Sequence, residues 1–138
     1  MYGGDSDAGQ RIVVPFLRYS GVDRIDRLIV THADSDHAGG LASLQSALPV
    51  DLLLSSIASL PGGLCAAGQA WQWDGVDFAI LHPSAEDYAV DRKNNHLSCV
   101  LSVTAGEHRM LLTADIEAAD EAAMLARDAG TLRADVLL

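Results

Sequence analysis

The sequence has little positive charge. Nine lysines and arginines stand against nineteen aspartates and glutamates, so the formal net charge is −10 at pH 7. A groove that binds nucleic acid by neutralising phosphates needs clustered basic side chains, and this composition argues against such a groove. It leaves room for a nucleic acid substrate that is held mainly by metal ions.

Long apolar runs are also missing. Stretches such as VDLLL at residues 50–54 are far shorter than the about 20 apolar residues that a helix needs to cross a bilayer. The composition is 49% hydrophobic and 20% charged, with 4 prolines and 12 glycines, which is typical of a globular chain. Its 138 residues suffice for one compact domain. We therefore expect this segment to be soluble and not to insert into a membrane.

Cysteine is rare, with two residues 34 positions apart, Cys65 and Cys99. Neither has a second cysteine at zinc-knuckle spacing, and two residues do not make a disulfide framework. Cys99 lies in the strand-like stretch SCVLSV, where a cysteine behaves as a small buried hydrophobe. We therefore expect both to be structural.

The spacing of apolar residues predicts alternating helices and strands. An Asp-Gly pair at residues 74–75 and an Ala-Gly-Glu stretch at 105–107 indicate hairpin turns. The expected elements are a helix at 9–19, strands at 27–31 and 50–55, a helix at 39–48, a hairpin at 71–82, a polar loop at 84–96, a hairpin at 98–113, a helix at 116–127 and a strand at 134–138. This order predicts an α/β sandwich.

Residues 30–40 read VTHADSDHAGG and hold the densest group of metal-binding side chains. Alternate residues of an extended segment point to the same side, so His32, Asp34 and Asp36 can converge, with His37 at the following bend. Imidazole and carboxylate groups are ligands of Zn²⁺ and related ions. The pattern therefore predicts a metal site directly after a buried strand.

The simpler alternative is a polar loop in which Asp34 or Asp36 caps the next helix and both histidines are solvated. A single histidine would favour that alternative. Four ligand-type side chains favour a metal instead. They precede Gly39 and Gly40, which let the backbone turn close to a bound group.

The same run resembles the HxHxDH signature of the metallo-β-lactamase superfamily, with Asp34 in place of the second histidine. The variant HxDxDHxGG is similar to the hydrolase domain of the ComEC family of competence proteins. Later segments resemble that family's later strands in the same order: AGQAWQWDGVDFAILHP, NNHLSCVLSV and RMLLTADIE. The resemblance implies that residues 1–138 form a partial α/β domain, a four-layer αββα metallo-β-lactamase-like sandwich.

The resemblance also implies the ligands of two adjacent divalent metal ions. It assigns His32 and Asp34 to one ion, Asp36 and His37 to the other, and Asp115 to a bridge between them. Asp36 is in addition the expected catalytic residue, which orients the attacking water. Taken alone, Asp115 lies between a predicted strand and a helix, where an aspartate is more often an N-cap. The oxygen-rich ligand set shifts the expected ions from Zn²⁺ toward Mn²⁺ or Mg²⁺, with Zn²⁺ still possible.

Asn95 and Ser98 match the family's Asn-x-x-Ser pattern and are candidate substrate-binding residues. A turn-forming asparagine and a serine that begins a strand explain the same pattern equally well.

The remaining histidines and the tryptophans are not expected to do chemistry. We expect His96 to be solvated, His82 to be structural and His108 to be exposed at a hairpin turn. Trp71 and Trp73 alternate on one strand face, which favours a core or sheet-covering role over base stacking.

The family resemblance implies a metal-dependent hydrolase, of phosphodiesterase or nuclease type, that acts on one DNA strand during DNA uptake. The expected partners are single-stranded DNA and the membrane channel portion of a parent protein associated with the inner membrane. Two alternatives stay open: a metallo-β-lactamase-fold esterase or lactamase, and a non-catalytic metal-binding scaffold. Asp34 disfavours the first, because lactamase-type zinc sites prefer histidine there, and the net charge supports the second.

Two departures from the family pattern indicate a domain that is incomplete at both ends. The family has two strands before the region matched by this chain and a His-His-Gly-Ser type segment after it, and the latter supplies another metal ligand. We therefore expect the second ion to be bound weakly and the fragment alone to be inactive.

Overall fold

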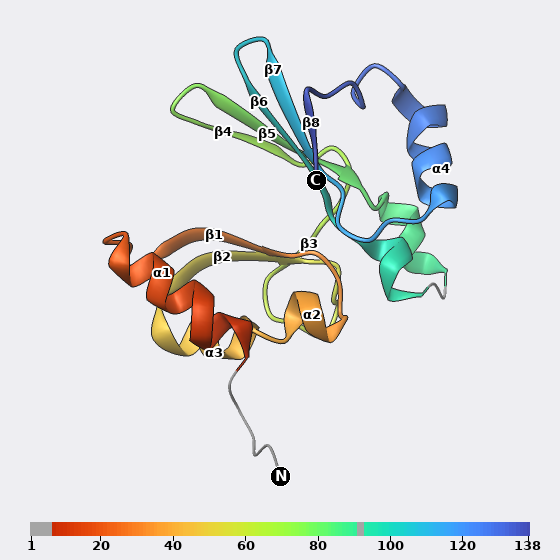
Figure 1. Ribbon diagram of the computed structural model, residues 1–138. Helices are drawn as coiled ribbons and strands as arrows, with labels where there is room; N and C mark the ends of the chain where they lie inside the picture. The colour runs from red at the N-terminus through yellow and green to blue at the C-terminus, as the bar shows by residue number, and fades with distance from the viewer. Residues whose placement is uncertain (1–6, 91–92) are drawn as a thin grey trace. The chain divides into compact units, whose positions relative to one another are not determined.

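The structure is a computed structural model that describes residues 7–90 and 93–138. The chain divides into two compact units, Met1–Gly63 and Leu64–Leu138. Each unit combines a β-sheet with helices (Figure 1). The mixture of α and β elements follows the order that the sequence predicts.

The first unit begins with two consecutive helical segments. Its elements are the π-helical turn η1 (Gly9–Val13), α1 (Val14–Tyr19), β1 (Ile25–Val30), α2 (Ser35–Ala38), α3 (Leu41–Ala47), β2 (Val50–Ser55) and β3 (Gly63–Leu64). Pro15 lies in the first turn of α1, where its missing N–H costs no hydrogen bond. The helix predicted at 9–19 is therefore confirmed, and Pro15 lies in the first turn of its α-helical part.

The two long strands of this unit, β1 and β2, pair in parallel, with Ile25 opposite Val50 and Val30 opposite Ser55. Helices α1 and α3 lie beside them (Figure 1). Val14, Leu44 and Leu48 form the buried core between these elements, with Leu28 of β1 packed against them. This core fixes the strand whose end carries the histidines and aspartates.

The start of η1 and the start of α3 are in close backbone contact. A Cβ atom added at Gly9 would lie 2.4 Å from the carbonyl oxygen of Gly40. Asp7 reinforces the contact, because its carboxylate accepts hydrogen bonds from the Ser43 hydroxyl at 2.6 Å and from the backbone N–H of Gln10 at 2.8 Å. The Ser43 hydrogen bond holds the pKa of Asp7 below its usual value. The sequence requires glycine here for helix packing.

The second unit is built on a five-stranded sheet with the order β4-β5-β6-β7-β8. Its elements are β4 (Ala70–Trp73), β5 (Val76–His82), the 3₁₀ turns η2 (Ala85–Ala89) and η3 (Asn94–Leu97), β6 (Val100–Ala105), β7 (His108–Leu112), α4 (Ala118–Asp128) and β8 (Val136–Leu137). The polar loop predicted at 84–96 thus contains two short helical turns, and residues 91–92 lie outside the described ranges.

Both predicted hairpins are present. Asp74 and Gly75 adopt φ angles of 48° and 80°, the left-handed conformations that a tight two-residue turn requires. Gly106, with φ of 60°, opens the turn between β6 and β7. Strands β4 to β7 pair antiparallel, whereas β8 pairs with β7 in parallel.

Helix α4 covers one face of this sheet. Met124 of α4 packs with Val100 and Leu111 of the central strands into a buried cluster. Trp71 belongs to an aromatic cluster, in which its ring stacks on Phe78 of the neighbouring strand with ring centroids 5.4 Å apart. Trp73 meets Phe78 edge-on, and 43% of its surface is exposed. The aromatic side chains therefore cover the sheet, as predicted, although Trp73 is not a core residue.

The prediction for the cysteines was incomplete. Both side chains are buried, as expected, with Cys65 at 0% and Cys99 at 1% exposure. They are bonded to each other as a disulfide, which corrects the expectation that the two cysteines are not part of a disulfide framework. Pairing across 34 positions depends on the tertiary fold, so spacing alone could not reveal it.

Within the described ranges, no helix combines the length and the apolar character needed to cross a bilayer.

Replacing Gly9 with alanine should destabilise the protein. The new Cβ would collide with the Gly40 backbone, which cannot move aside as a side chain can. We expect the free energy of unfolding to fall by about 1–3 kcal/mol, as measured by urea denaturation. In the matched control Gly130→Ala, the nearest atom is the Asp128 carboxylate at 3.2 Å, and the change should stay within about 0.5 kcal/mol. Equal losses in both variants would contradict the packing explanation.

Candidate metal centre

The candidate centre lies between the carboxyl end of β1 and the short helix α2, which contains Asp36 and His37 (Figure 1). The backbone leaves the sheet after Val30, and the next residue, Thr31, is fixed from the neighbouring strand end. The hydroxyl of Ser56, directly after β2, donates a hydrogen bond of 2.8 Å to the Thr31 carbonyl. The parallel strands therefore position the start of the histidine segment.

Thr31 also contacts both imidazoles of the segment. Its hydroxyl oxygen lies 3.2 Å from Nδ1 of His32 and 3.3 Å from Nδ1 of His37. The two rings lie face to face at a tilt, with centroids 4.1 Å apart. Because the Thr31 hydroxyl contacts Nδ1 of each ring, we expect Nε2 to be the metal-binding atom of both histidines.

The two carboxylates approach these Nε2 atoms in separate pairs. Asp34 Oδ2 lies 3.6 Å from Nε2 of His32, and Asp36 Oδ2 lies 3.8 Å from Nε2 of His37. Two ligand atoms of one tetrahedral ion, each about 2.0–2.1 Å from it, lie about 3.4 Å apart. Both pairs match this spacing to within a few tenths of an ångström, so the donor set fits divalent metal ions.

Burial differs strongly within the group. His32 is completely buried, whereas the side chain of Asp36 is 77% exposed. The segment thus has one face anchored in the first unit and one face open to solvent. Such an arrangement can hold an ion rigidly and still admit a water or a substrate.

The helix-capping alternative for Asp34 is not what the structure shows. Asp34 is the N-cap residue of α2 by its backbone angles, and its carbonyl accepts hydrogen bonds from His37 and Ala38. Its side chain makes no capping hydrogen bond. The carboxylate is instead close to His32, as a ligand pair requires.

The two glycines after the segment also have a structural explanation within the first unit, while their predicted close approach to a bound group stays a prediction. A Cβ at Gly39 would lie 2.3 Å from the carbonyl oxygen of Ser35, and a Cβ at Gly40 would lie 2.9 Å from the backbone nitrogen of Gly9. Both glycines therefore allow close backbone packing within the first unit.

Asp115 belongs to the second unit, in the segment between β7 and α4. The N-cap of α4 is Glu117, not Asp115, and it forms a reciprocal capping box with Asp120. The residue before Asp115, Ala114, has a φ of 51°, a left-handed conformation that is costly for alanine.

Asn95 and Ser98 lie in and just after the turn η3 of the same unit. The Asn95 carbonyl accepts a hydrogen bond from the Ser98 backbone N–H at 3.0 Å, which is a turn-forming role. Ser98 is fully buried and Asn95 is half-buried. Their assignment to substrate binding remains a prediction.

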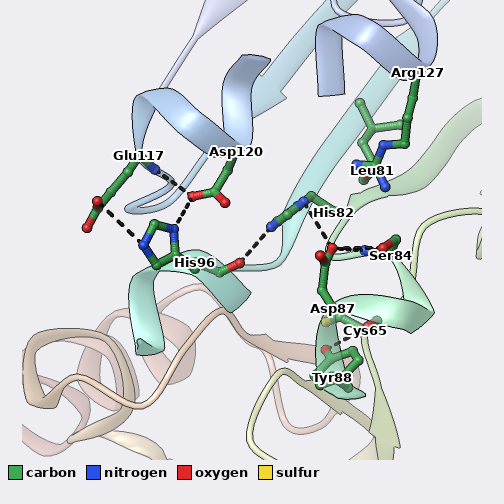
Figure 2. Close-up of polar contacts among 10 residues, drawn as sticks. All are labelled: Cys65, Leu81, His82, Ser84, Asp87, Tyr88, His96, Glu117, Asp120 and Arg127. Carbon is green, nitrogen blue, oxygen red and sulfur yellow. Dashed lines mark hydrogen bonds and ion pairs between the residues drawn. The ribbon is translucent and has the colours of Figure 1, made fainter. Parts of the chain in front are cut away.

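His96, between these two residues, is not solvated as predicted (Figure 2). Its Nδ1 lies 2.8 Å from the buried carboxylate of Asp120, and its Nε2 lies 3.6 Å from Glu117. The Asp120 carboxylate also accepts the Glu117 backbone N–H at 3.0 Å. One buried acid therefore joins η3 to the first turn of α4.

His82 and His108 behave as expected. His82 is buried, and its Nε2 lies 2.8 Å from the carbonyl oxygen of His96, so its role is structural (Figure 2). The side chain of His108 is 86% exposed at the hairpin turn.

Comparison with known proteins agrees with this geometry. A family model described as the metallo-β-lactamase superfamily matches residues 3–137. The chain is 37% identical over 138 residues to competence protein ComA of Neisseria gonorrhoeae, covering 98% of this chain and 19% of that protein. It is 37% identical over 113 residues to recombination protein 2 of Haemophilus influenzae, covering 79% of this chain and 14% of that protein. The chain therefore spans less than a fifth of these relatives.

Among solved structures, a mutant of CmlA beta-hydroxylase shares the fold, with a TM-score of 0.55 and 16% sequence identity. The match covers 83% of this chain and 26% of that one. At this identity the likeness concerns the fold alone. The predicted fold class and the resemblance to competence proteins are both confirmed.

Replacing Ala114 with glycine should stabilise the protein, because glycine adopts a positive φ without steric cost. We expect the free energy of unfolding to rise by about 0.5–1 kcal/mol, since relief of strain exceeds the added backbone entropy of the unfolded chain. Ala105→Gly, in an exposed strand position, is the control and should lower the free energy of unfolding by a similar amount. Changes of the same sign in urea denaturation would contradict the assignment of strain to Ala114.

Proposed function

Because the chain belongs to the metallo-β-lactamase superfamily, as a hydrolase-fold domain related to competence proteins, we propose that it is a metal-dependent phosphodiesterase that cleaves DNA. The observation that carries the proposal is the convergence of His32, Asp34, Asp36 and His37 at the end of β1. Two imidazoles and two carboxylates at ligand spacing form a donor set suited to divalent ions.

We assign His32 and Asp34 to one ion and Asp36 and His37 to a second. Two facts support this division: each aspartate is close to a different imidazole, and the two distances are similar. Asp115 is the proposed bridging ligand, on the strength of the sequence resemblance around RMLLTADIE.

Two such ions would lower the pKa of a water bound between them, orient the substrate and stabilise the charge that develops on the attacking and leaving oxygens. The protein residues supply positioning. We assign to Asp36, whose carboxylate is exposed, the role of accepting a hydrogen bond from the attacking water and orienting it. Thr31 holds the two rings in register, and the burial of His32 removes its freedom to rotate.

The substrate class follows from the ligand chemistry. Asp34 replaces a nitrogen ligand by an oxygen ligand, which favours harder ions such as Mn²⁺ or Mg²⁺ over Zn²⁺. Such ions suit the oxygens of a phosphodiester. The net charge of −10 fits a substrate held through the metal ions better than one held in a basic groove.

The relatives give the proposal a biological setting. They are named as a competence protein and a recombination protein. We propose that the DNA is a single strand encountered during uptake, and that the domain acts beside the channel portion of a longer, membrane-associated protein.

Replacing Thr31 with valine should weaken metal binding without removing a ligand. Valine has the same shape as threonine but lacks the hydroxyl that contacts both rings. Loss of such a supporting group typically lowers metal affinity about 10–100-fold. Isothermal titration with Mn²⁺ and Zn²⁺ measures the effect. The control is Thr131→Val. The Thr131 hydroxyl donates a hydrogen bond to the carbonyl of Asp128 at the end of α4. If both variants titrate like the wild type, Thr31 does not organise a metal site.

Cleavage of single-stranded DNA by the protein purified at its natural length, with Mn²⁺, should fall at least about a hundredfold in Asp36→Ala. Asp23→Ala, which removes an exposed aspartate just before the opposite end of β1, should cleave at the wild-type rate. Circular dichroism shows whether each variant is folded. Metal binding by the wild type without any DNA cleavage would reject the nuclease and favour the non-catalytic scaffold.

A further inference from the structure

The disulfide of the second unit joins two segments that are distant in sequence. Cys65 directly follows β3, and Cys99 directly precedes β6. Their Cα atoms are 5.9 Å apart, in the range most common for disulfides. Because Cys99 follows Ser98, the bond also anchors the turn that carries Asn95 and His96.

The backbone around Cys65 is held in place by contacts that do not involve sulfur. The hydroxyl of Tyr88 donates a hydrogen bond of 2.7 Å to the Cys65 carbonyl (Figure 2). The side chain of Gln69 bridges both sides of Cys65, accepting from the N–H of Ala66 at 3.0 Å and donating to the carbonyl of Leu64 at 2.9 Å. These hydrogen bonds hold the Cys65 backbone in place independently of the sulfur atoms. A backbone preorganised in this way favours the oxidised form.

The burial of both sulfur atoms distinguishes a structural disulfide from a catalytic or labile one. Exposures of 0% and 1% leave neither sulfur accessible to a thiolate from solvent. Thiol–disulfide exchange requires such access, so the folded unit cannot cycle as a catalytic dithiol or as a labile redox switch. It also follows that the bond forms before the core closes over it.

We propose that Cys65–Cys99 is a permanent structural disulfide, installed by a thiol–disulfide oxidoreductase while this domain folds in an oxidising compartment outside the cytosol. One cysteine thiolate attacks the disulfide of the oxidoreductase and forms a mixed disulfide, and the second thiolate then displaces the oxidoreductase cysteine. The protein dithiol is oxidised by two electrons. The oxidoreductase disulfide is reduced to a dithiol, which takes up the two protons.

The compartment follows from the redox chemistry. Cytosolic glutathione and thioredoxin keep protein thiols reduced, and persistent buried disulfides belong to secreted, periplasmic and cell-surface domains. The inference goes beyond the proposed function because it specifies the side of the membrane on which the candidate metal centre would meet its substrate. It does not depend on a metal or on DNA.

The test measures the redox state of the two cysteines in cells that produce the protein at its natural length. The cells are quenched with acid and denatured, free thiols are alkylated with N-ethylmaleimide, and the peptides that contain Cys65 and Cys99 are analysed by mass spectrometry. Structural disulfides are strongly favoured over their dithiols, so we expect more than about 95% of these peptides to be linked to each other. Recovery of both peptides in the alkylated form would overturn the proposal.

A second arm identifies the oxidant and the compartment. In cells without the extracytoplasmic thiol–disulfide oxidoreductase, the linked fraction should fall at least severalfold, and added cystine should restore it. An unchanged linked fraction would overturn the oxidoreductase assignment. Cys65→Ser and Cys99→Ser are the controls, since each should leave its partner cysteine open to alkylation. The readout is chemical and needs no folded variant, so it stays independent of the outcome of the DNA-cleavage assay.

Discussion

The hydrogen bonds at the carboxyl end of β1 are the constraint on which the candidate metal centre depends. Ser56 fixes the Thr31 carbonyl from the end of β2, and the Thr31 hydroxyl contacts both histidine rings. The buried position of His32 adds a steric restraint. The two imidazoles are thereby positioned by the protein itself, which lowers the conformational entropy that their side chains lose when ions bind.

A comparable constraint organises the second unit. The carboxylate of Asp120 accepts the Glu117 backbone N–H and lies within hydrogen-bond distance of Nδ1 of His96. The segment that carries Asp115 is therefore held at its helix end by a capping box and next to η3 by an imidazole. On the other side of η3, the disulfide fixes Cys99. In this unit a buried acid and a covalent bond provide the rigidity that strand pairing provides in the first.

Local features of the sequence were the ones that could be predicted. The His32–His37 segment could be predicted as a metal site because its four ligand-type side chains fall within six consecutive positions after a strand. The hairpins could be predicted because an Asp-Gly pair, here Asp74 and Gly75, is typical of a tight turn whose residues need a positive φ. For Gly39 and Gly40, the structure adds a second reason to the predicted approach to a bound group. Their missing side chains admit backbone atoms of the same unit.

Features that depend on distant partners could not be read from the sequence. His96 looked solvated because its partner, Asp120, lies 24 positions away on α4. The disulfide was not predicted for the same reason, because spacing in the sequence does not show whether two cysteine side chains meet in the fold. Asp115 illustrates the opposite case, in which a local pattern suggests a role that another residue fills. The pattern of strand, aspartate and helix suggested a cap, and only the structure showed that Glu117 has that role.

X-ray absorption spectroscopy of the metal-loaded protein tests the central claim most directly. The account predicts a first shell of nitrogen and oxygen, which for Zn²⁺ lies at about 2.0–2.1 Å, with the outer-shell scattering of imidazole carbons from His32 and His37. A second metal at about 3.5–4 Å should also be visible. A shell of oxygen atoms alone, with no imidazole scattering, would contradict the proposal that these two histidines hold metal ions.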